Sequence, residues 1–226
     1  MWKFKFDRDS TGLKDDWING LPTPDLMPVP ASFADFYTDK DSREYTGDFW
    51  YETDVFVPEE WRGKSIQLRF GCATHRATIY VNGVMITSHE GGFLPFVADI
   101  TEAAEYNSMN KVVVLMNNEL SDITIPYGRT VTLENGKKMS RPFFDFYNYS
   151  GLQRSVSLLA LPKESVFDYT VSFELTGKDA KVFYSVVTTG TNNVSVILKD
   201  EAGNEAAKAE GKEGVLNVPD AHLWNV

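Results

Sequence analysis

The amino-acid sequence predicts an all-β protein, with one complete β-sandwich followed by part of a second. Short runs that alternate apolar and polar residues, or that are rich in β-branched and aromatic residues, recur between turn signals. The 3.6-residue periodicity of helices is nearly absent. The chain has 226 residues, 42% of them hydrophobic and 13% aromatic, so it can form a hydrophobic core and does not have the composition of a disordered chain.

The first series of strands is the clearest. Pro58 ends the first alternating run because proline has no N–H for a sheet ladder. Asn82-Gly83 predicts a two-residue hairpin turn, since both residues adopt positive φ readily. The continuous apolar run KVVVLM suits a strand that is buried on both faces. The strands expected in this series are Asp48 to Val57, Ser65 to Phe70, Ala77 to Val81, Val84 to Ser88, Lys111 to Met116 and Ser155 to Leu161.

A second series begins after a proline and two charged residues, Pro162-Lys163-Glu164, which predict a domain boundary. The expected strands are Val166 to Leu175, Lys181 to Thr188 and Asn193 to Lys199. The polar stretch from Asp200 to Gly214 is expected to be a long hairpin connection. Only about 60 residues follow the boundary, whereas an immunoglobulin-like sandwich takes about 100. We therefore expect a complete domain over residues 1–162 and an incomplete one over residues 163–226.

Two segments lie outside this strand rhythm. Pro22 to Pro30 has four prolines in nine positions and is expected to be extended and rigid. Ser121 to Arg141 is expected to be a long connection with a turn at Asn135-Gly136. Connections of that length in a compact domain are usually functional or mobile.

Composition argues against several classes of partner. With 22 Lys and Arg against 32 Asp and Glu, the formal net charge is −10, which disfavours binding to nucleic acid or to an anionic membrane surface. Cys72 is the only cysteine, so no internal disulfide can form, and we expect it to be a small buried hydrophobic residue. The start lacks a signal-peptide pattern, and no run of about 18 apolar residues occurs. We therefore expect a cytoplasmic protein without a membrane partner.

A search for catalytic motifs is mostly negative. There is no glycine-rich phosphate loop, no metal-ligand spacing of His or Cys, and no Gly-x-Ser-x-Gly elbow, so no cofactor and no metal site are expected. His75, His89 and His222 show no repeated spacing to a Cys or Asp, and we expect them to be structural or surface groups.

One segment, Arg141 to Arg154, is chemically dense. It places Asp145 and Asn148 among the aromatic residues Phe143, Phe144, Phe146, Tyr147 and Tyr149. Aromatic faces pack on sugar rings, and carboxylates and amides bind hydroxyl groups, so the composition suits a carbohydrate subsite. The alternative is an aromatic corner of the core in which Asp145 and Asn148 cap backbone groups in a turn.

Here the sequence resembles the bacterial β-glucuronidases of glycoside hydrolase family 2. The segment from Asp145 to Val156 closely resembles their D-F-x-N-Y-x-G-L-x-R-x-V signature. The resemblance is strong over about residues 10 to 161, and Leu223-Trp224-Asn225 looks like a Leu-Trp motif near the end of the family's second sandwich. The other supporting segments, in the family's order, are Gly47 to Glu52, Leu68 to Gly71, Val81 to Gly83, His89 to Phe96 and Asn117 to Leu120.

The resemblance implies an N-terminal jelly-roll sugar-binding domain, an immunoglobulin-like sandwich and a (β/α)₈ barrel that holds both catalytic glutamates. It predicts that this chain has no catalytic residue and is inactive alone, because the barrel is not in it. Asn118-Glu119 copies the dipeptide of the family's acid/base residue. It follows the buried strand of the first sandwich, however, and matches the jelly-roll motif N-N-E-L, so we expect a structural role.

The resemblance carries one functional residue over to this chain. In the family, the aspartate of D-F-x-N-Y reaches the barrel and hydrogen-bonds hydroxyls of the glucuronic acid ring, and Asp145 occupies that position. Asn148 and Tyr149 are lesser candidates for substrate binding. The sequence departs from several relatives at Phe144 and Gln153, where they have His. The partners implied are a β-glucuronide, the missing barrel domain and further copies of the full-length enzyme.

Two other functions stay open. The first is that the chain is a free-standing carbohydrate-binding module, which would bind sugar through the aromatic segment around Asp145. The second is that the chain is the N-terminal part of a sister family 2 enzyme, a β-galactosidase or a β-mannosidase.

Overall fold

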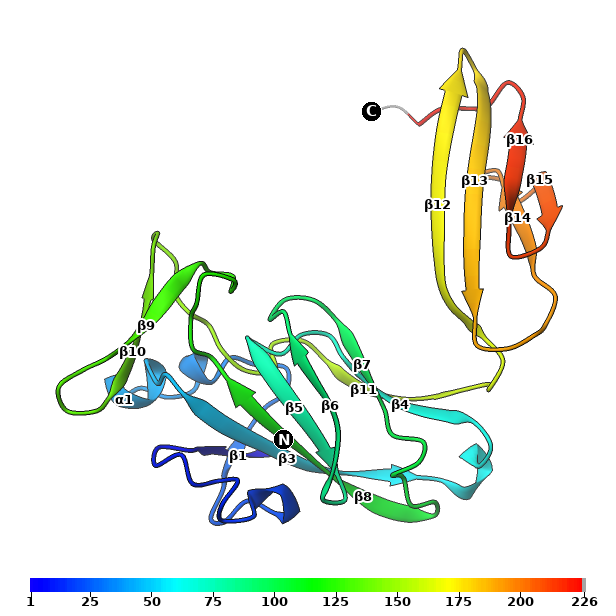
Figure 1. The fold of residues 1–226 in the computed structure, drawn as a ribbon. Coiled ribbons are helices and arrows are strands. Elements are labelled where there is room, and N and C mark those ends of the chain that lie inside the picture. Colours follow the sequence, from blue (N-terminus) through cyan, green and yellow to red (C-terminus); the bar gives the residue numbers. More distant parts are fainter. Residues whose placement is uncertain (225–226) are drawn as a thin grey trace. The chain divides into compact units, whose positions relative to one another are not determined.

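The computed structural model describes residues 1–224, so the last residues of the Leu-Trp motif, from Asn225, lie outside the described part. The chain divides into two compact units, one over Met1–Leu161 and one that begins at Pro162. Both are built of antiparallel strands, which confirms the all-β class (Figure 1). Helical structure in the described residues is limited to short pieces: η1 (Trp17–Asn19), η2 (Phe33–Asp35), α1 (Lys40–Arg43) and η3 (Glu59–Trp61).

The first unit is a sandwich of two main sheets with a separate hairpin. The larger sheet has six strands in the order β2-β1-β3-β8-β5-β6, and the smaller has three in the order β11-β4-β7. The strands of the larger sheet are β1 (Trp2–Phe6), β2 (Asp25–Met27), β3 (Asp48–Val57), β5 (Arg76–Val81), β6 (Val84–Glu90) and β8 (Ser108–Asn117). Those of the smaller sheet are β4 (Ser65–Phe70), β7 (Phe96–Asp99) and β11 (Val156–Leu161).

The core lies between these two sheets. Alternate residues of β3, β4, β5 and β8 point inward, as the period of two in a strand requires, and most of their side chains are buried. On β8, Val112 and Val114 join this core, whereas Val113 packs on the opposite face with Trp17 and Trp50. The sequence prediction of a strand buried on both faces is therefore confirmed. Cys72 is also buried, as expected.

Local sequence explains several boundaries in this unit. Asn82 and Gly83 have φ values of 50° and 80°, which is the left-handed pair that a type I′ hairpin turn needs. Gly151 has a φ of 133°, and a Cβ there would lie 2.8 Å from the carbonyl oxygen of Ala31 and from the hydroxyl of Tyr51. Glycine at this point of the N-Y-S-G run is therefore required by close packing.

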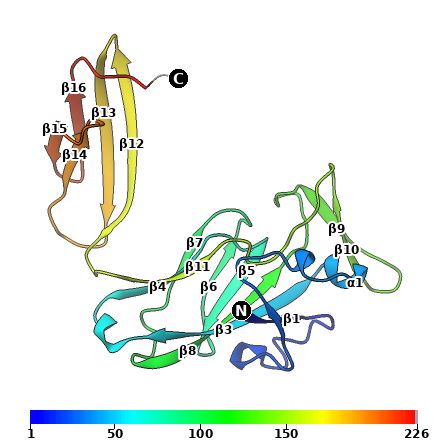
Figure 2. The ribbon, with the colours of Figure 1, turned by 180° about the vertical axis from the view of Figure 1, so that it is seen from behind.

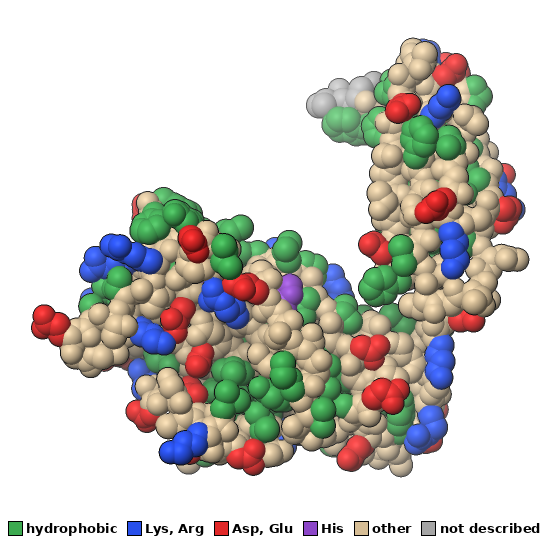
Figure 3. Space-filling model, in the orientation of Figure 1, with side chains coloured by type: hydrophobic (Ala, Val, Ile, Leu, Met, Phe, Trp, Pro, Cys, Tyr) green, Lys and Arg blue, Asp and Glu red, His purple; other side chains and the backbone are tan. Residues whose placement is uncertain are grey.

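The expected long connection from Ser121 to Arg141 is partly wrong. It contains a hairpin, β9 (Gly128–Thr132) and β10 (Lys138–Pro142), in which the Asn135-Gly136 turn joins the two strands. Figures 1 and 2 show the hairpin beside α1, and an ion pair between Lys137 and Asp41 joins the two. Hydrophobic side chains gather at the surface around this hairpin (Figure 3).

The second unit has one three-stranded and one two-stranded sheet. The first has the order β12-β13-β16, with β12 (Val166–Thr176), β13 (Asp179–Thr188) and β16 (Glu213–Val218), and the second pairs β14 (Ser195–Lys199) with β15 (Glu205–Glu210). The expectation of a single long hairpin connection over Asp200 to Gly214 is wrong, because β15 and the start of β16 lie there. That this unit is an incomplete immunoglobulin-like domain stays a prediction.

Candidate functional site

The segment that the sequence singles out, residues 143–149, is an irregular loop between β10 and β11. Its five aromatic side chains are between 37% and 54% exposed, so they do not form a buried corner of the core. Tyr127 packs edge-on against Phe143, with ring centroids 4.8 Å apart, and Phe144 packs similarly against Phe146. The loop therefore presents aromatic faces at the surface of the first unit, as a carbohydrate subsite requires.

Asp145 lies in the middle of this loop and is exposed. Within residues 1–224 its carboxylate makes no hydrogen bond and no ion pair. An ionised carboxylate has about four lone-pair sites, and all of them on Asp145 are free to accept hydrogen bonds from a ligand. Tyr149 is also exposed, and its hydroxyl makes no hydrogen bond in the described residues.

The loop is fixed at both sides of Asp145. The N–H of Phe143 donates to the carbonyl oxygen of Tyr127 at 3.1 Å. The hydroxyl of Tyr147 donates to the carbonyl oxygen of Arg43, the last residue of α1, at 2.8 Å. Residues 144–146 make no such bond, so the position of Asp145 depends on these flanking anchors.

Asn148 provides the most heavily bonded anchor. Its Nδ2 donates to the carbonyl oxygen of Asn118 at 3.0 Å and to the Ser140 hydroxyl at 3.2 Å. Its Oδ1 lies 2.7 Å from Nε2 of His75. The side chain therefore ties the loop to the residues that follow β8, to β10 and to the segment before β5.

His75 is only 2% exposed, and burial lowers the pKa of its imidazole, which the hydrogen bond to Asn148 offsets in part while the charge of Arg76 adds to the lowering. The Nδ1 atom has no hydrogen-bond partner among the described residues. On that side of the ring, a Cβ on Gly92 would lie only 2.9 Å from Nδ1. Gly92 therefore packs directly against the imidazole, where a larger residue would collide with the ring.

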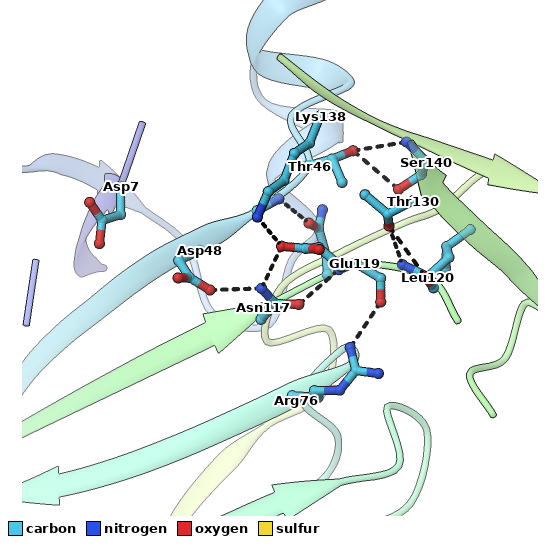
Figure 4. A network of polar contacts seen from close by, with 12 residues as sticks. Asp7, Thr46, Asp48, Arg76, Asn117, Glu119, Leu120, Thr130, Lys138 and Ser140 are labelled. Atoms are coloured by element: carbon cyan, nitrogen blue, oxygen red, sulfur yellow. Dashed lines mark hydrogen bonds and ion pairs between the residues drawn. The ribbon is translucent and has the colours of Figure 1, made fainter. Parts of the chain in front are cut away.

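Glu119, the residue of the decoy dipeptide, belongs to a structural network (Figure 4). Its Oε1 accepts from Nζ of Lys138 at 2.5 Å and from Nδ2 of Asn117 at 3.3 Å, and Asn117 also donates to Asp48 at 2.7 Å. The guanidinium of Arg76 donates to the backbone carbonyl of Glu119 at 2.9 Å. These contacts join the β9–β10 hairpin to the ends of β3, β5 and β8, consistent with the structural role expected for Glu119.

One cavity adjoins the anchored loop, and a second adjoins His75. One of about 220 Å³ is lined by Tyr45, Met139, Phe146, Tyr147 and Asn148, among others. The other, of about 320 Å³, is lined by His75, Gly92, Phe93, Ile123 and Ile125, among others. Both have mainly apolar walls, which suits contact with the C–H faces of a ligand or with another apolar surface.

Sequence reasoning singled out the loop and Asp145, but it missed the contact between His75 and Asn148. These residues are 73 positions apart, so no local pattern joins them. The ring of His89 bonds instead to the carbonyl oxygen of Gly91, through Nε2 at 3.1 Å, and His222 belongs to the second unit. Among residues 1–224, no group of three or more His, Cys, Asp and Glu is placed to hold a metal ion, and no helix is long and apolar enough to cross a membrane.

The first unit is a β-sandwich that carries an exposed aromatic loop. Residues 1–162 match the family model described as glycosyl hydrolases family 2, sugar binding domain. The chain therefore belongs to glycoside hydrolase family 2, and the family expected from the motifs is confirmed.

Curated relatives that the chain resembles include several named β-glucuronidase. The one from Paenibacillus borealis is 40% identical over 232 residues, which cover 99% of this chain and 39% of the relative. The one from Homo sapiens is 34% identical over 246 residues and is covered to 38%. The chain thus spans less than half the length of the relatives it matches.

The structure is similar to that of the β-glucuronidase from Ruminococcus gnavus. The two share 58% sequence identity and superpose with a TM-score of 0.93, over 100% of this chain and 38% of the other. The R. gnavus enzyme has also been solved in complex with uronic isofagomine.

Proposed function

We propose that this chain is the non-catalytic N-terminal part of a retaining β-glucuronidase that hydrolyses β-D-glucuronides. In this proposal the chain supplies a scaffold and the Asp145 carboxylate, and a (β/α)₈ barrel outside the chain supplies the bond chemistry. Retaining hydrolysis needs two carboxylates about 5–5.5 Å apart, one as acid/base and one as nucleophile. Nothing in the exposed loop, which offers Asp145 alone, provides such a pair.

The observation that carries the proposal is the state of Asp145. Its carboxylate is exposed, makes no hydrogen bond or ion pair within the described residues and lies between the two fixed ends of an aromatic loop. A carboxylate held in this way can orient hydroxyl groups of a sugar without taking part in bond cleavage. Orientation of a substrate can supply several kcal/mol of the reaction barrier. Asn148 and Tyr149 are the lesser candidates for contacts in the same subsite.

The test compares this chain with the enzyme encoded by the complete reading frame. We expect the complete enzyme to hydrolyse a chromogenic β-glucuronide and the 226-residue chain to release no chromophore above the buffer rate. The matched β-galactoside and β-mannoside serve as control substrates, and preference for either would favour the sister activities. Turnover of the glucuronide by the 226-residue chain at the rate of the complete enzyme would overturn the proposal.

A free-standing sugar-binding module is the second candidate, because the exposed aromatic side chains favour it. Calorimetry of the 226-residue chain with millimolar glucuronate separates the two. An isolated subsite makes few contacts, so we expect no measurable heat. Saturable heat that Asp145→Ala abolishes would support the module instead.

The proposal includes two further expectations, that the complete enzyme is a homo-oligomer and that it is cytoplasmic. Light scattering of the purified enzyme tests the first, and cell fractionation with an activity assay tests the second.

A further inference from the structure

Asn148 and His75 form a side-chain pair whose hydrogen-bond roles follow from chemistry. The Asn118 carbonyl oxygen can only accept a hydrogen bond, so the NH₂ group of Asn148 faces it, at 3.0 Å. The amide oxygen of Asn148 must then face His75, and Nε2 of His75 must carry the proton that it donates across 2.7 Å. A neutral imidazole has only one ring proton, so Nδ1 is left as a bare acceptor.

The imidazole is held on both sides. On one side Asn148 accepts a hydrogen bond from the ring. On the other side Gly92 packs so closely that a Cβ on it would lie 2.9 Å from Nδ1. The N–H of His75 donates to the carbonyl oxygen of Asn117 at 3.0 Å, which fixes its backbone at the end of β8. The ring is therefore a fixed point of the sandwich to which the loop is attached.

The loop has few other attachments near Asp145. Asp145 itself and its neighbours Phe144 and Phe146 make no hydrogen bond in the described residues. Asn148 is three residues further along, and it is the nearest side chain that bonds to the buried part of the domain. Tyr147 lies between them, but it bonds to Arg43, which is exposed, so a change in the position of Asn148 is expected to move the carboxylate of Asp145.

We propose that His75 is a positioning residue, which acts through Asn148 to hold the loop that carries Asp145 in the geometry for binding the substrate. This inference rests on the proposed function of Asp145. Both polar ends of the Asn148 amide are bonded within the protein, so this side chain can orient the loop whether or not it also contacts the sugar. A displacement of about 1 Å in a positioned group can lower a rate about 100-fold, so the contact matters although His75 is buried away from the loop surface.

The test is a double-mutant cycle in the complete enzyme, with kcat and KM measured on a chromogenic β-glucuronide. His75→Leu removes the donor, and we expect it to lower kcat/KM about 10- to 100-fold, with the same division between kcat and KM that Asp145→Ala shows. His75→Gln keeps an N–H donor near the position of Nε2 and is expected to stay within about 3-fold of the wild type. His222→Leu, an exposed histidine of the second unit, is the control that leaves kcat/KM unchanged.

The cycle separates positioning from general destabilisation. If His75 acts through Asp145, His75→Leu in the Asp145→Ala background lowers kcat/KM by less than about 3-fold more. Losses that multiply in the double variant would overturn the inference, and so would an unchanged kcat/KM in His75→Leu. If Asp145→Ala alone leaves kcat/KM unchanged, the proposed function of Asp145 fails first.

Folding of each variant is checked by its thermal midpoint and by near-UV circular dichroism. If His75→Leu does not fold, Asn148→Ser tests the same link from the loop, with the same expected loss and the same dependence on Asp145. Rescue by His75→Gln is then decisive, because a folded His75→Gln enzyme with a loss as large as that of Asn148→Ser contradicts the positioning role.

Discussion

Two long strands, β3 of the first unit and β12 of the second, have similar patterns and different surroundings. β3 lies between β1 and β8, and its residues Phe49, Trp50 and Tyr51 are fully buried. β12 pairs only with β13, and all of its residues are exposed, including Phe173 at 67%. An alternating sequence therefore specifies a strand, but the elements that pack on the strand decide how much it stabilises the fold.

The largest expected effect on stability is the difference between core substitutions in these two strands. Phe49→Ala removes a fully buried ring and is expected to lower the free energy of unfolding of the first unit by about 3–5 kcal/mol. Phe173→Ala on β12 is the matched control and is expected to cost less than about 1 kcal/mol in the second unit. Hydrogen exchange read by mass spectrometry reports each unit separately. Equal losses at the two positions would contradict the difference in burial.

Glu52 adds a buried ion-pair network to β3, a second source of stability that β12 lacks. Its side chain is 1% exposed and accepts from Lys3 at 2.5 Å, from Lys111 at 3.0 Å and from the N–H of Leu21 at 2.7 Å. Burial raises the pKa of this carboxyl, but these hydrogen bonds outweigh the burial and lower it overall. Glu52→Gln is expected to destabilise the first unit by about 1–3 kcal/mol, because it leaves the two ammonium groups without their partner.

The sign of the pH dependence follows from the lowered pKa. The stabilisation by Glu52 is complete above the pKa of the unfolded chain, near 4.5, and is lost as the pH falls from there toward the folded value. Urea unfolding of the wild type between pH 6 and pH 3 measures it. A Glu52→Gln variant with an equally steep decline would show that other carboxyls are responsible.

His75 is expected to make stability depend on pH as well, with a smaller effect than that of Glu52 and at higher pH. Burial lowers its pKa, so the folded unit stays neutral at this site while the unfolded chain binds a proton below pH 6.5. Stability is expected to be level above that pH and to fall below it, by at most about 1.4 kcal/mol per pH unit. His75→Gln should remove this slope and His222→Gln should keep it. A slope unchanged in His75→Gln would assign the proton uptake to another group.

The sequence was most informative where local residues decide the structure. The bounds of β3 and β4 match the predicted runs, and Asn82-Gly83 marks its hairpin. β15, with the sequence EAAKAE, was missed because Ala, Glu and Lys have low β propensity, and pairing with β14 overrides that preference. β9 and β10 were missed because the segment reads as turns, although its strands pair with each other in regular register.

The same limit applies to the candidate site. Asp145 can be proposed from the sequence because the motif around it is contiguous. The support of its loop could not be found in this way, because Asn148 bonds to His75 and Asn118, which come from different parts of the chain. Contacts of this kind depend on how the strands are ordered in the sheets, and no run of neighbouring residues encodes them.

The smallest expected effect on stability is at Asp145. Its exposed side chain has no partner in the described residues, so Asp145→Ala is expected to change the free energy of unfolding of the chain by less than about 0.5 kcal/mol. Urea unfolding of the two proteins side by side measures it. A loss of 2 kcal/mol or more would mean that Asp145 supports the fold.

The most direct test of the central claim is the kinetics of Asp145→Ala in the complete enzyme, with Asp145→Asn as the matched variant of similar size. Asp145 is proposed to bind hydroxyls of the sugar, so its loss is expected to lower kcat/KM for a β-glucuronide about 100-fold or more while the thermal midpoint stays unchanged. A complete enzyme that carries Asp145→Ala and retains nearly wild-type kcat/KM would contradict the assignment of this loop as part of the substrate site.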